Sequence, residues 1–381
     1  MQRFYSLDVF RGATVCLMIL VNNPGSWSHI YPPLAHASWH GLTPTDLVFP
    51  FFLFAVGNAI AFVLPRLREA GDAAFWQKIL KRTFLIFLIG LFLNWWPFSY
   101  WKESEWVFRA WVNPDNPESG VRIMGVLQRI ALCYFFAALL AYYLKPRAAL
   151  LAATILLLTY WGICYWGNPS DPYSLEGWIG TARVDRPVLG VAHLYKGEGV
   201  PFDPEGLLST MAAISQVCFG YLAGYYIRKK GKTAEMLNGL FIAGIALLLT
   251  GFAWDMVFPI NKKIWTSSFT VYTTGLALLT IGAMIYFVEF RNWRGGLARF
   301  FDVFGKNALF VFALSAFLPK GLSLIRFADG SNPWSWLYAN LYRHVLPADP
   351  RLGSLLYAIT VILFMWGICY WMDKRKIYIK V

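Results

Sequence analysis

Two histidines, His36 and His40, stand four residues apart just before one of the most apolar segments of the chain, residues 47–65. Imidazole is the side chain best suited to moving protons near neutral pH, and in a helix this spacing would also put two metal ligands on one face. Two prolines and a glycine within residues 32–41 favour a loop, and no third ligand stands nearby. The pattern favours proton transfer by at least one histidine, with a metal site or a structural histidine as the alternatives.

The four residues before the apolar segment have the pattern of a helix start. Thr43 fits the N-cap, Pro44 the first helical position and Asp46 the third. A carboxylate at that position is favoured by the helix dipole, so Asp46 is interpreted first as a capping residue. The alternative is that it orients a nearby histidine and stabilises the cationic form of the ring. The two roles are compatible.

Asn22, Asn23, Pro24 and Gly25 end the first apolar segment, and such residues often stop a helix. A side-chain amide at that depth also has the chemistry to donate a hydrogen bond to a developing oxyanion.

Several polar residues interrupt the later apolar segments. Gln128 and Arg129 fall inside one of them, where a charge is expensive and faces the bundle interior, a water-filled cavity or a partner. Arg129 therefore forms a structural ion pair or binds an anionic or carbonyl-bearing ligand. Lys306 is interpreted first as a snorkelling lysine. Residues 219–224 contain a G-x-x-x-G motif, which favours helix packing over chemistry.

The elements that must position these residues are predicted to be membrane helices. The 381 residues are 57% hydrophobic and 14% charged, whereas soluble domains carry nearer a quarter charged residues. A spanning helix needs about 20 mostly apolar residues. The sequence predicts an all-α polytopic bundle of about ten such helices in one domain over residues 1–381, at roughly 9–25, 47–65, 79–97, 121–144, 148–167, 207–227, 234–258, 268–289, 300–318 and 352–372.

The positive charges predict the orientation of these helices. With a cytoplasmic N-terminus, the loops on the inner side hold 20 Lys and Arg, and the outer loops hold 12 over more than twice the length. Positive residues accumulate in cytoplasmic loops, so both termini are predicted to be cytoplasmic. The net charge of +13 is explained in the same way, and no nucleic-acid partner is expected. All five histidines then lie on the outer side. The outer loop 168–206 holds six acidic and three basic residues, so it suits a small cationic or sugar-like ligand, with an ordinary solvated loop as the alternative.

Six segments together resemble the heparan-α-glucosaminide N-acetyltransferase family of membrane acyltransferases, including its bacterial NagX-like members. They are SLDVFRG (6–12), HASWHGLTPTDLVFPFFLF (36–54), GVLQRIALCYF (125–135), DRPVLGVAHLY (185–195), FDPEGLLST (202–210) and RKIYIKV (375–381). The resemblance spans nearly the whole chain.

This resemblance implies transfer of an acetyl group from cytoplasmic acetyl-CoA to the amine of a terminal glucosamine on the far side of the membrane. It implies His36 as the catalytic residue, with Asp46 and Asn22 beside it. The loop between Asn22 and His36 is longer here, so the family asparagine is Asn22 or Asn23. The lysosomal member has asparagine at the position of His40, and it carries a large additional luminal region. We therefore expect a small amino sugar or a cell-wall fragment as the acceptor.

The same resemblance suggests binding roles. Arg11 and Arg129 stand in the family motifs and are expected to serve acetyl-CoA or the core. Lys306, outside these motifs, is also expected to bind acetyl-CoA, and Arg129 to line the path of the acyl arm. The residues expected to contact the acceptor are Trp39, His40, His193 and Glu205. No metal is expected. The family also implies a homodimer and a place in the bacterial inner membrane.

The residues are compatible with this chemistry. An amine that attacks a thioester must lose a proton, which a neutral imidazole can accept, and the tetrahedral intermediate needs a donor for its oxyanion. His36 is then the general base, or it carries the acetyl group itself. Two other functions remain open. One is a proton-coupled amino-sugar permease with Arg129 in its pathway. The other is an outer metal-dependent hydrolase built on His36, His40 and outer acidic residues.

Overall fold

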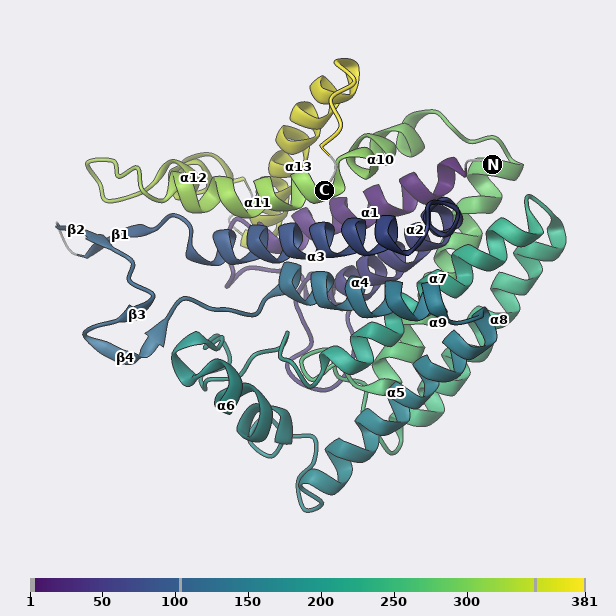
Figure 1. Cartoon of the computed structure of the whole chain (residues 1–381). Coiled ribbons are helices and arrows are strands. Elements are labelled where there is room, and N and C mark those ends of the chain that lie inside the picture. The colour runs from purple at the N-terminus through teal and green to yellow at the C-terminus, as the bar shows by residue number, and fades with distance from the viewer. Residues whose placement is uncertain (1–3, 103–104, 346–347, 380–381) are drawn as a thin grey trace.

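A computed structural model describes residues 4–102, 105–345 and 348–379. Helices pack side by side, and two small β-hairpins project at one end (Figure 1). The α-helices of the described residues are α1 (Tyr5–Asn22), α2 (Val48–Ala70), α3 (Asp72–Trp95), α4 (Val126–Tyr143), α5 (Pro146–Gly167), α6 (Arg186–Leu189), α7 (Thr210–Lys230), α8 (Ala234–Asp255), α9 (Ser267–Ile285), α10 (Gly296–Lys306), α11 (Ala308–Leu322), α12 (Pro333–Leu337) and α13 (Pro350–Lys374). Shorter 3-10 and π segments are η1 (Pro32–Leu34), η2 (Pro44–Leu47), η3 (Gly180–Asp185), η4 (Val191–His193), η5 (Tyr286–Phe290) and η6 (Tyr338–Tyr342).

Seven helices within the described residues are long and apolar enough to cross a membrane. They are α1, η2 with α2, α4, α5, α8, α9 with η5, and α13. The pair α10 and α11 also passes this test together but is bent by 78°, so it adds an eighth span only if the bent pair is one span. The chain is a multi-pass helical membrane protein, and the predicted all-α bundle is confirmed.

All ten predicted segments are helical, but α3 and α7 fall outside this apolar set. The first half of α3 carries charges that include Lys78, Lys81 and Arg82. Most of α7 is buried by other helices, so it needs no lipid-facing apolar surface. The number of apolar spans is therefore seven or eight in the described residues, below the predicted ten.

Helices α2 and α7 touch backbone to backbone. A Cβ on Gly220 would stand 2.1 Å from the carbonyl oxygen of Phe54, and one on Gly224 would stand 2.8 Å from that of Asn58. A Cβ on Gly57 of α2 would in turn stand 1.9 Å from the carbonyl oxygen of Val217. Small residues allow this close approach, so the packing role predicted for the G-x-x-x-G motif is confirmed.

The two described ends of the chain meet at α10. Helix α1 packs on α10, where the Arg11 guanidinium donates to the carbonyl of Gly305 at 3.0 Å. The segment that follows α13 returns to the end of α10, where the Asn307 amide donates to the carbonyl of Ile377 at 3.1 Å. The two ends therefore lie on one side of the bundle, as a cytoplasmic location for both would require.

The segment predicted as one span over 300–318 is broken at Asn307, which corrects that prediction. Both ends of the Asn307 amide bind the backbone near the end of the chain, since its oxygen also accepts from the Ile379 N–H at 2.9 Å. Lys306 binds Asp302 at 2.7 Å and Asp373 at 3.0 Å. These contacts of Lys306 and Asn307 stabilise the corner between α10 and α11.

The loop between α3 and α4 forms two antiparallel hairpins that the all-α prediction did not contain. The first pairs β1 (Ser99–Lys102) with β2 (Glu105–Phe108), and the second pairs β3 (Val112–Asn113) with β4 (Asn116–Gly120). The loop 168–206 is also structured, because two of its own side chains, Trp178 and Phe202, are fully buried.

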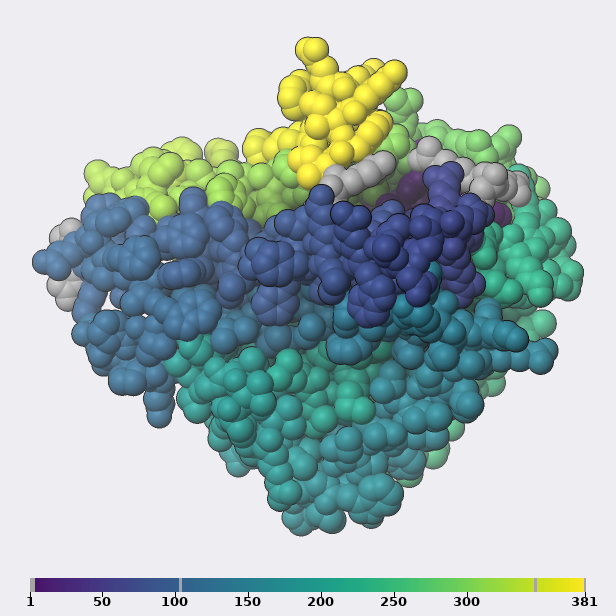
Figure 2. Space-filling model, in the orientation of Figure 1, coloured from purple at the N-terminus to yellow at the C-terminus, as the bar shows by residue number. Residues whose placement is uncertain are grey.

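Helix α13 stands out from the rest of the bundle (Figures 1 and 2). Its protruding part exposes large apolar side chains, namely Leu363, Phe364 and Trp371. In a membrane these residues would contact lipid.

Candidate active site

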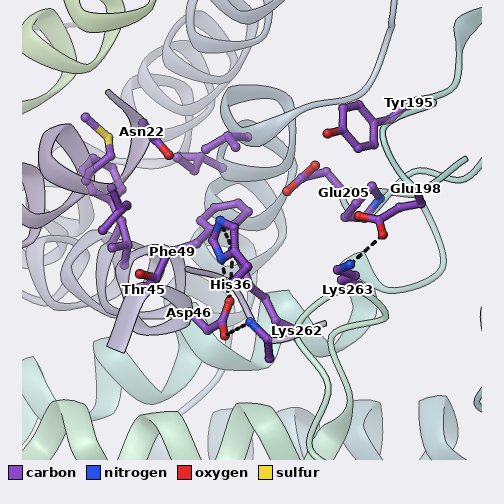
Figure 3. Close-up of a pocket in the computed structure, with 18 of the residues that line it drawn as sticks. Asn22, His36, Thr45, Asp46, Phe49, Tyr195, Glu198, Glu205, Lys262 and Lys263 are labelled. Atoms are coloured by element: carbon purple, nitrogen blue, oxygen red, sulfur yellow. Dashed lines mark hydrogen bonds and ion pairs between the residues drawn. The ribbon is translucent and has the colours of Figure 1, made fainter. Parts of the chain in front are cut away.

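A cavity of about 280 Å³ lies where α1 ends and α2 begins. Its walls come from α1, the loop 36–46, the start of α2 and α4, the end of the 168–206 loop, and the loop between α8 and α9. The polar lining residues are Asn22, His36, Trp39, Thr45, Asp46, Arg122, Tyr195, Glu198, Glu205, Lys262 and Lys263. Most of them are labelled in Figure 3.

Asp46 is the buried centre of this site, with 1% of the residue exposed. Its Oδ2 accepts from the N–H of Thr43 at 3.0 Å, from the Thr43 hydroxyl at 3.0 Å and from the N–H of Ala37 at 3.1 Å. Thr43 is the N-cap and Pro44 the first residue of η2, as predicted. The same carboxylate therefore starts the helix and holds the loop that carries His36.

The other oxygen of Asp46 binds His36, since Nδ1 and Oδ1 are 2.7 Å apart. The His36 side chain is 44% exposed, so one edge of the ring faces the cavity. A hydrogen bond from Nδ1–H to the carboxylate leaves Nε2 unprotonated, and this is the arrangement of a general base. Both predicted roles of Asp46, capping and orienting a histidine, are thus present together.

Lys262, in the loop between α8 and α9, is the third member of this cluster. Its Nζ lies 3.5 Å from Asp46 Oδ1, 3.0 Å from His36 Nδ1 and 3.4 Å from His36 Nε2. Burial lowers the pKa of the Lys262 ammonium, although the Asp46 carboxylate acts to raise it. A partly buried cation, an anion and an imidazole therefore share one corner of the cavity (Figure 3).

The two asparagines at the end of α1 have different surroundings. Asn22 lines the cavity. Asn23 is 7% exposed, and its amide donates back to the carbonyl of Ile19 at 3.0 Å, as a residue that ends a helix does. Of the two candidates for the family asparagine, Asn22 is the one that faces the cavity.

Glu205 lies on the same cavity but does not stand alone. Arg122 binds Glu205 and holds Asp203 with two bonds, of 2.6 and 2.9 Å. Burial alone would raise the pKa of Glu205, but the Arg122 and Arg129 guanidinium groups and the Lys262 ammonium together outweigh burial and lower it. The ring of Tyr195 lies 4.8 Å from the Arg122 guanidinium and completes this wall.

Trp39 forms the wall beside a second ion pair. Its indole N–H donates to the carbonyl of Tyr173 at 2.8 Å, which fixes the ring. Lys263 lies 5.8 Å from the centre of the ring and binds Glu198 at 2.5 Å. The acidic side chains of the 168–206 loop that reach the cavity are therefore paired with cations.

Two predicted acceptor contacts lie outside the cavity lining. His40 is bonded through Nδ1 to the amide of Asn261 at 3.3 Å, and burial lowers its pKa. His193 is bonded through Nδ1 to the carbonyl of Val121 at 2.6 Å and packs on Trp111. Both have structural partners, and their contact with the acceptor stays a prediction.

Arg129 is fully buried in α4 and does not line the cavity. Its guanidinium binds the Ser209 hydroxyl and the carbonyl of Gly206, and it lies 5.3 Å from the centre of the Trp265 ring. These contacts join α4 to the segment that carries Glu205. A role for Arg129 in donor binding stays a prediction.

A second cavity, of about 360 Å³, lies at the other end of α1. Arg11, Asp8, Asn58 and Arg66 are its polar lining residues. Asn58 is 3% exposed, and neither its amide nitrogen nor its amide oxygen has a hydrogen-bond partner in the described structure. Lys306 does not line this cavity but pairs with acidic residues at the end of α10.

Sequence reasoning singled out His36, Asp46, Asn22, Trp39 and Glu205, and all five line the cavity between the end of α1 and the start of α2. It missed Arg122, Lys262 and Lys263, because lysine and arginine in loops carry no motif of their own. The one signal was the position of Lys262 and Lys263, the only cations in the short outer loop 259–267. Among the described residues, no group of three or more His, Cys, Asp or Glu side chains is placed to hold a metal ion.

The fold and the site together define a multi-pass membrane protein with a His–Asp pair and a partly buried lysine at one end of its bundle. Residues 3–174 match the family model described as "Heparan-alpha-glucosaminide N-acetyltransferase, catalytic". The human heparan-alpha-glucosaminide N-acetyltransferase is 29% identical over 371 residues, covering 81% of this chain and 52% of its own length. The mouse protein of that name is 28% identical, covering the whole of this chain and 61% of its own length.

These matches confirm the resemblance found in the motifs. The chain is similar to the heparan-alpha-glucosaminide N-acetyltransferases of human and mouse, and it spans between half and two thirds of the length of these two proteins.

Proposed function

We propose that this protein is a transmembrane N-acetyltransferase that moves an acetyl group from acetyl-CoA on the inner side to the amine of a glucosamine-type sugar on the outer side. One observation carries the proposal. A candidate general base, His36 held by Asp46, lies in a cavity at one end of the bundle, and a basic cavity suited to an anionic donor lies at the other. The names of the relatives support the reaction class.

His36 would take a proton from the attacking amine through Nε2, and Asp46 would stabilise the imidazolium that results. Asn22, which lines the same cavity, is proposed as a donor to the oxyanion of the tetrahedral intermediate. A route in which His36 first accepts the acetyl group uses the same residues, with Nε2 as the nucleophile.

The cavity between α1 and α2 at their inner ends is proposed as the entry site of the donor. Acetyl-CoA carries phosphates, which Arg11 and Arg66 would attract, together with the Arg228–Lys230 cluster at the end of α7. The amide of Asn58 is suited to the amides of the pantetheine arm, since it has both a donor and an acceptor to offer. On α2 the nearest lining residues of the two cavities, Phe52 and Ala55, are three positions apart, or about 4.5 Å along the helix.

The charges of the cavity that contains His36 favour a neutral amine over an ammonium ion. Its three carboxylates, Asp46, Glu198 and Glu205, each have a cation partner. No lining carboxylate is left to anchor a second cation, whereas ion pairs and the Trp39 ring suit sugar hydroxyls and a sugar face. We propose a small amino sugar, a bacterial inner-membrane location and a homodimer, the last two on the family resemblance.

The test is acetyl transfer by the purified protein, with acetyl-CoA and glucosamine as substrates. Wild type should form N-acetylglucosamine, and His36→Ala should bind acetyl-CoA without transferring it. His29→Ala is the matched control, because His29 is an outer histidine that does not line the cavity, and it should retain turnover. If wild type forms no product but proteoliposomes take up glucosamine without acetyl-CoA, the protein is a permease and this proposal fails.

A further inference from the structure

Lys262 has more hydrogen-bonding capacity than its contacts use. An ammonium carries three donors. Nδ1 of His36 cannot both donate to Asp46 at 2.7 Å and accept from Lys262 at 3.0 Å. Since the carboxylate needs a donor, the proton belongs on Nδ1, and the acceptors left to Lys262 in this cluster are Asp46 Oδ1 and His36 Nε2, at long distances of 3.5 and 3.4 Å. With three donors and two long contacts, the ammonium has a donor to spare.

The position of this ammonium is suited to a reacting carbonyl. An amine bound to His36 Nε2 would lie about 3 Å from it, and the thioester carbonyl under attack would lie next to that amine. Lys262 Nζ is 3.4 Å from the same Nε2. In the view of Figure 3, Asn22 and Lys262 lie on opposite sides of the His36 ring, so the two can approach the reacting centre from different directions.

We propose that Lys262 is a catalytic residue whose ammonium moves from Asp46 to the oxyanion of the tetrahedral intermediate. This inference rests on the proposed acetyl transfer. Before the attack, the negative charge of Asp46 is balanced by Lys262. After the attack, Asp46 balances the imidazolium and Lys262 balances the oxyanion, so the centre stays neutral throughout.

The step balances as follows. The amine lone pair forms the N–C bond, the carbonyl π pair moves to oxygen, and the amine proton moves to His36 Nε2. On collapse the oxygen pair re-forms the carbonyl, and the C–S bond breaks with its pair on sulfur. The thiolate then takes the proton from the imidazolium, which restores neutral His36 and releases CoA as a thiol.

The remaining charges of the cavity do not alter this balance. Arg122 is paired with Glu205 and Lys263 with Glu198, and these pairs come from the loop before α4, the end of the 168–206 loop and the loop that carries Lys262. Tyr195 packs on Arg122. Apart from these, the titratable groups facing the reacting corner are His36, Asp46 and Lys262. Because burial lowers the pKa of Lys262, the active ammonium should be lost at a lower pH than for an ordinary lysine.

The test compares kcat against pH for wild type, Lys262→Met and Lys262→Arg in the acetyl-transfer assay. Removing one oxyanion donor lowers kcat by roughly 10²–10³-fold, which is the loss expected for Lys262→Met. Lys262→Arg keeps a cation that does not titrate, so its activity should persist at alkaline pH where wild-type activity falls. A purely structural lysine would not move that alkaline limb.

Lys263→Met is the matched control, since it removes the neighbouring lysine and its pair with Glu198. It should change the KM for the sugar and leave the alkaline limb in place. The inference is overturned if Lys262→Arg loses activity at the same pH as wild type, or if Lys262→Met turns over within about threefold of wild type. In either case the acetyl transfer by wild type and its loss in His36→Ala still stand. Absence of transfer by wild type would overturn both proposals.

Discussion

Asp46 is the residue on which the site depends, because one buried carboxylate serves a helix start, a loop and a histidine. Its Oδ2 is occupied by backbone and hydroxyl donors, and its Oδ1 faces His36 and Lys262. This one side chain therefore contributes both to the stability of the fold and to the chemistry of the site, and its substitution should change both.

The first prediction separates these two roles. Asp46→Asn places an amide NH₂ where an acceptor is needed, so it should destabilise the fold by about 2–4 kcal/mol and lower kcat by roughly 10²–10⁴-fold. Thr43→Val removes a hydroxyl bond to the same carboxylate but leaves the charge, and it should lose about 1 kcal/mol and keep most turnover. Thermal unfolding and the transfer assay measure both. Equal loss of kcat in the two variants would contradict a chemical role for the carboxylate.

A second prediction concerns Asp185, which is fully buried in η3. Burial raises its pKa to about 7, although the bond from the Leu207 N–H acts against this shift. The folded protein therefore binds a proton that the unfolded chain releases near pH 4. The resulting stabilisation is present at low pH and is lost as pH rises from about 4 to 7. Its size is up to about 4 kcal/mol at 1.36 kcal/mol per pKa unit.

Asp185→Asn should flatten this dependence, because its side chain cannot ionise. We expect the Tm of wild type to fall between pH 5 and 8 more than that of the variant. Asp115→Asn, an exposed change in a hairpin, is the control and should follow wild type. A variant that follows wild type across this range would show that Asp185 does not titrate there.

Among single residues, the sequence predicted those site residues whose role follows from the residues next to them in the chain. Asp46 follows its cap by three positions, and Asn22 ends a visible apolar segment. Lys262 could not be predicted, because it is 226 residues from His36 and meets it only through the packing of α2, α7 and α9. Arg122 likewise meets Glu205 across 83 residues.

Among the elements, α2 and α7 are in close backbone contact, and this gives the third prediction. Gly220→Ala would place a Cβ 2.1 Å from the carbonyl oxygen of Phe54, so the helices must separate. We expect a loss of about 1–3 kcal/mol or more, measured by thermal unfolding in detergent. Gly367→Ala in α13 is the control, since no atom lies within 4 Å of its Cβ position, and it should cause no loss. A tolerated Gly220→Ala would show that α2 and α7 do not pack this closely.

The helices themselves were predictable from apolar runs, whereas their breaks were not. The corner at Asn307 depends on a side chain that binds the returning chain end some 70 residues later. The hairpins of residues 99–120 are short and mostly exposed, so they leave little hydrophobic pattern to detect.

At the scale of the molecule, α1 and α2 connect a basic cavity at one end with the His36 cavity at the other. Asn58 is a buried polar residue of the basic cavity, and its amide lacks partners within the described chain. An unpaired buried amide costs about 1–3 kcal/mol unless a ligand or water completes it.

The fourth prediction follows from this cost. If the donor completes the Asn58 amide, Asn58→Leu should raise the KM for acetyl-CoA by roughly tenfold, leave the KM for glucosamine unchanged and not lower the Tm. Asn23→Leu is the comparison, because its amide already binds the backbone of α1, and it should lose stability. A lower Tm with an unchanged KM for Asn58→Leu would assign that amide a structural role.

The fifth prediction is that the two substrates react from opposite sides of a membrane. Acetyl-CoA is too polar to cross a bilayer, so vesicles loaded with it and bathed in glucosamine keep the substrates apart. If the cavities at the two ends of α1 are the donor and acceptor sites, N-acetylglucosamine should appear in the bath, and vesicles with His36→Ala should form none. Supplying both substrates only to the bath should yield no product, because molecules whose acceptor site faces the bath then lack acetyl-CoA, and inverted molecules lack glucosamine at their acceptor site. If product forms only when both substrates are in the bath, both substrates bind from the same side, and the proposal of separate donor and acceptor cavities fails.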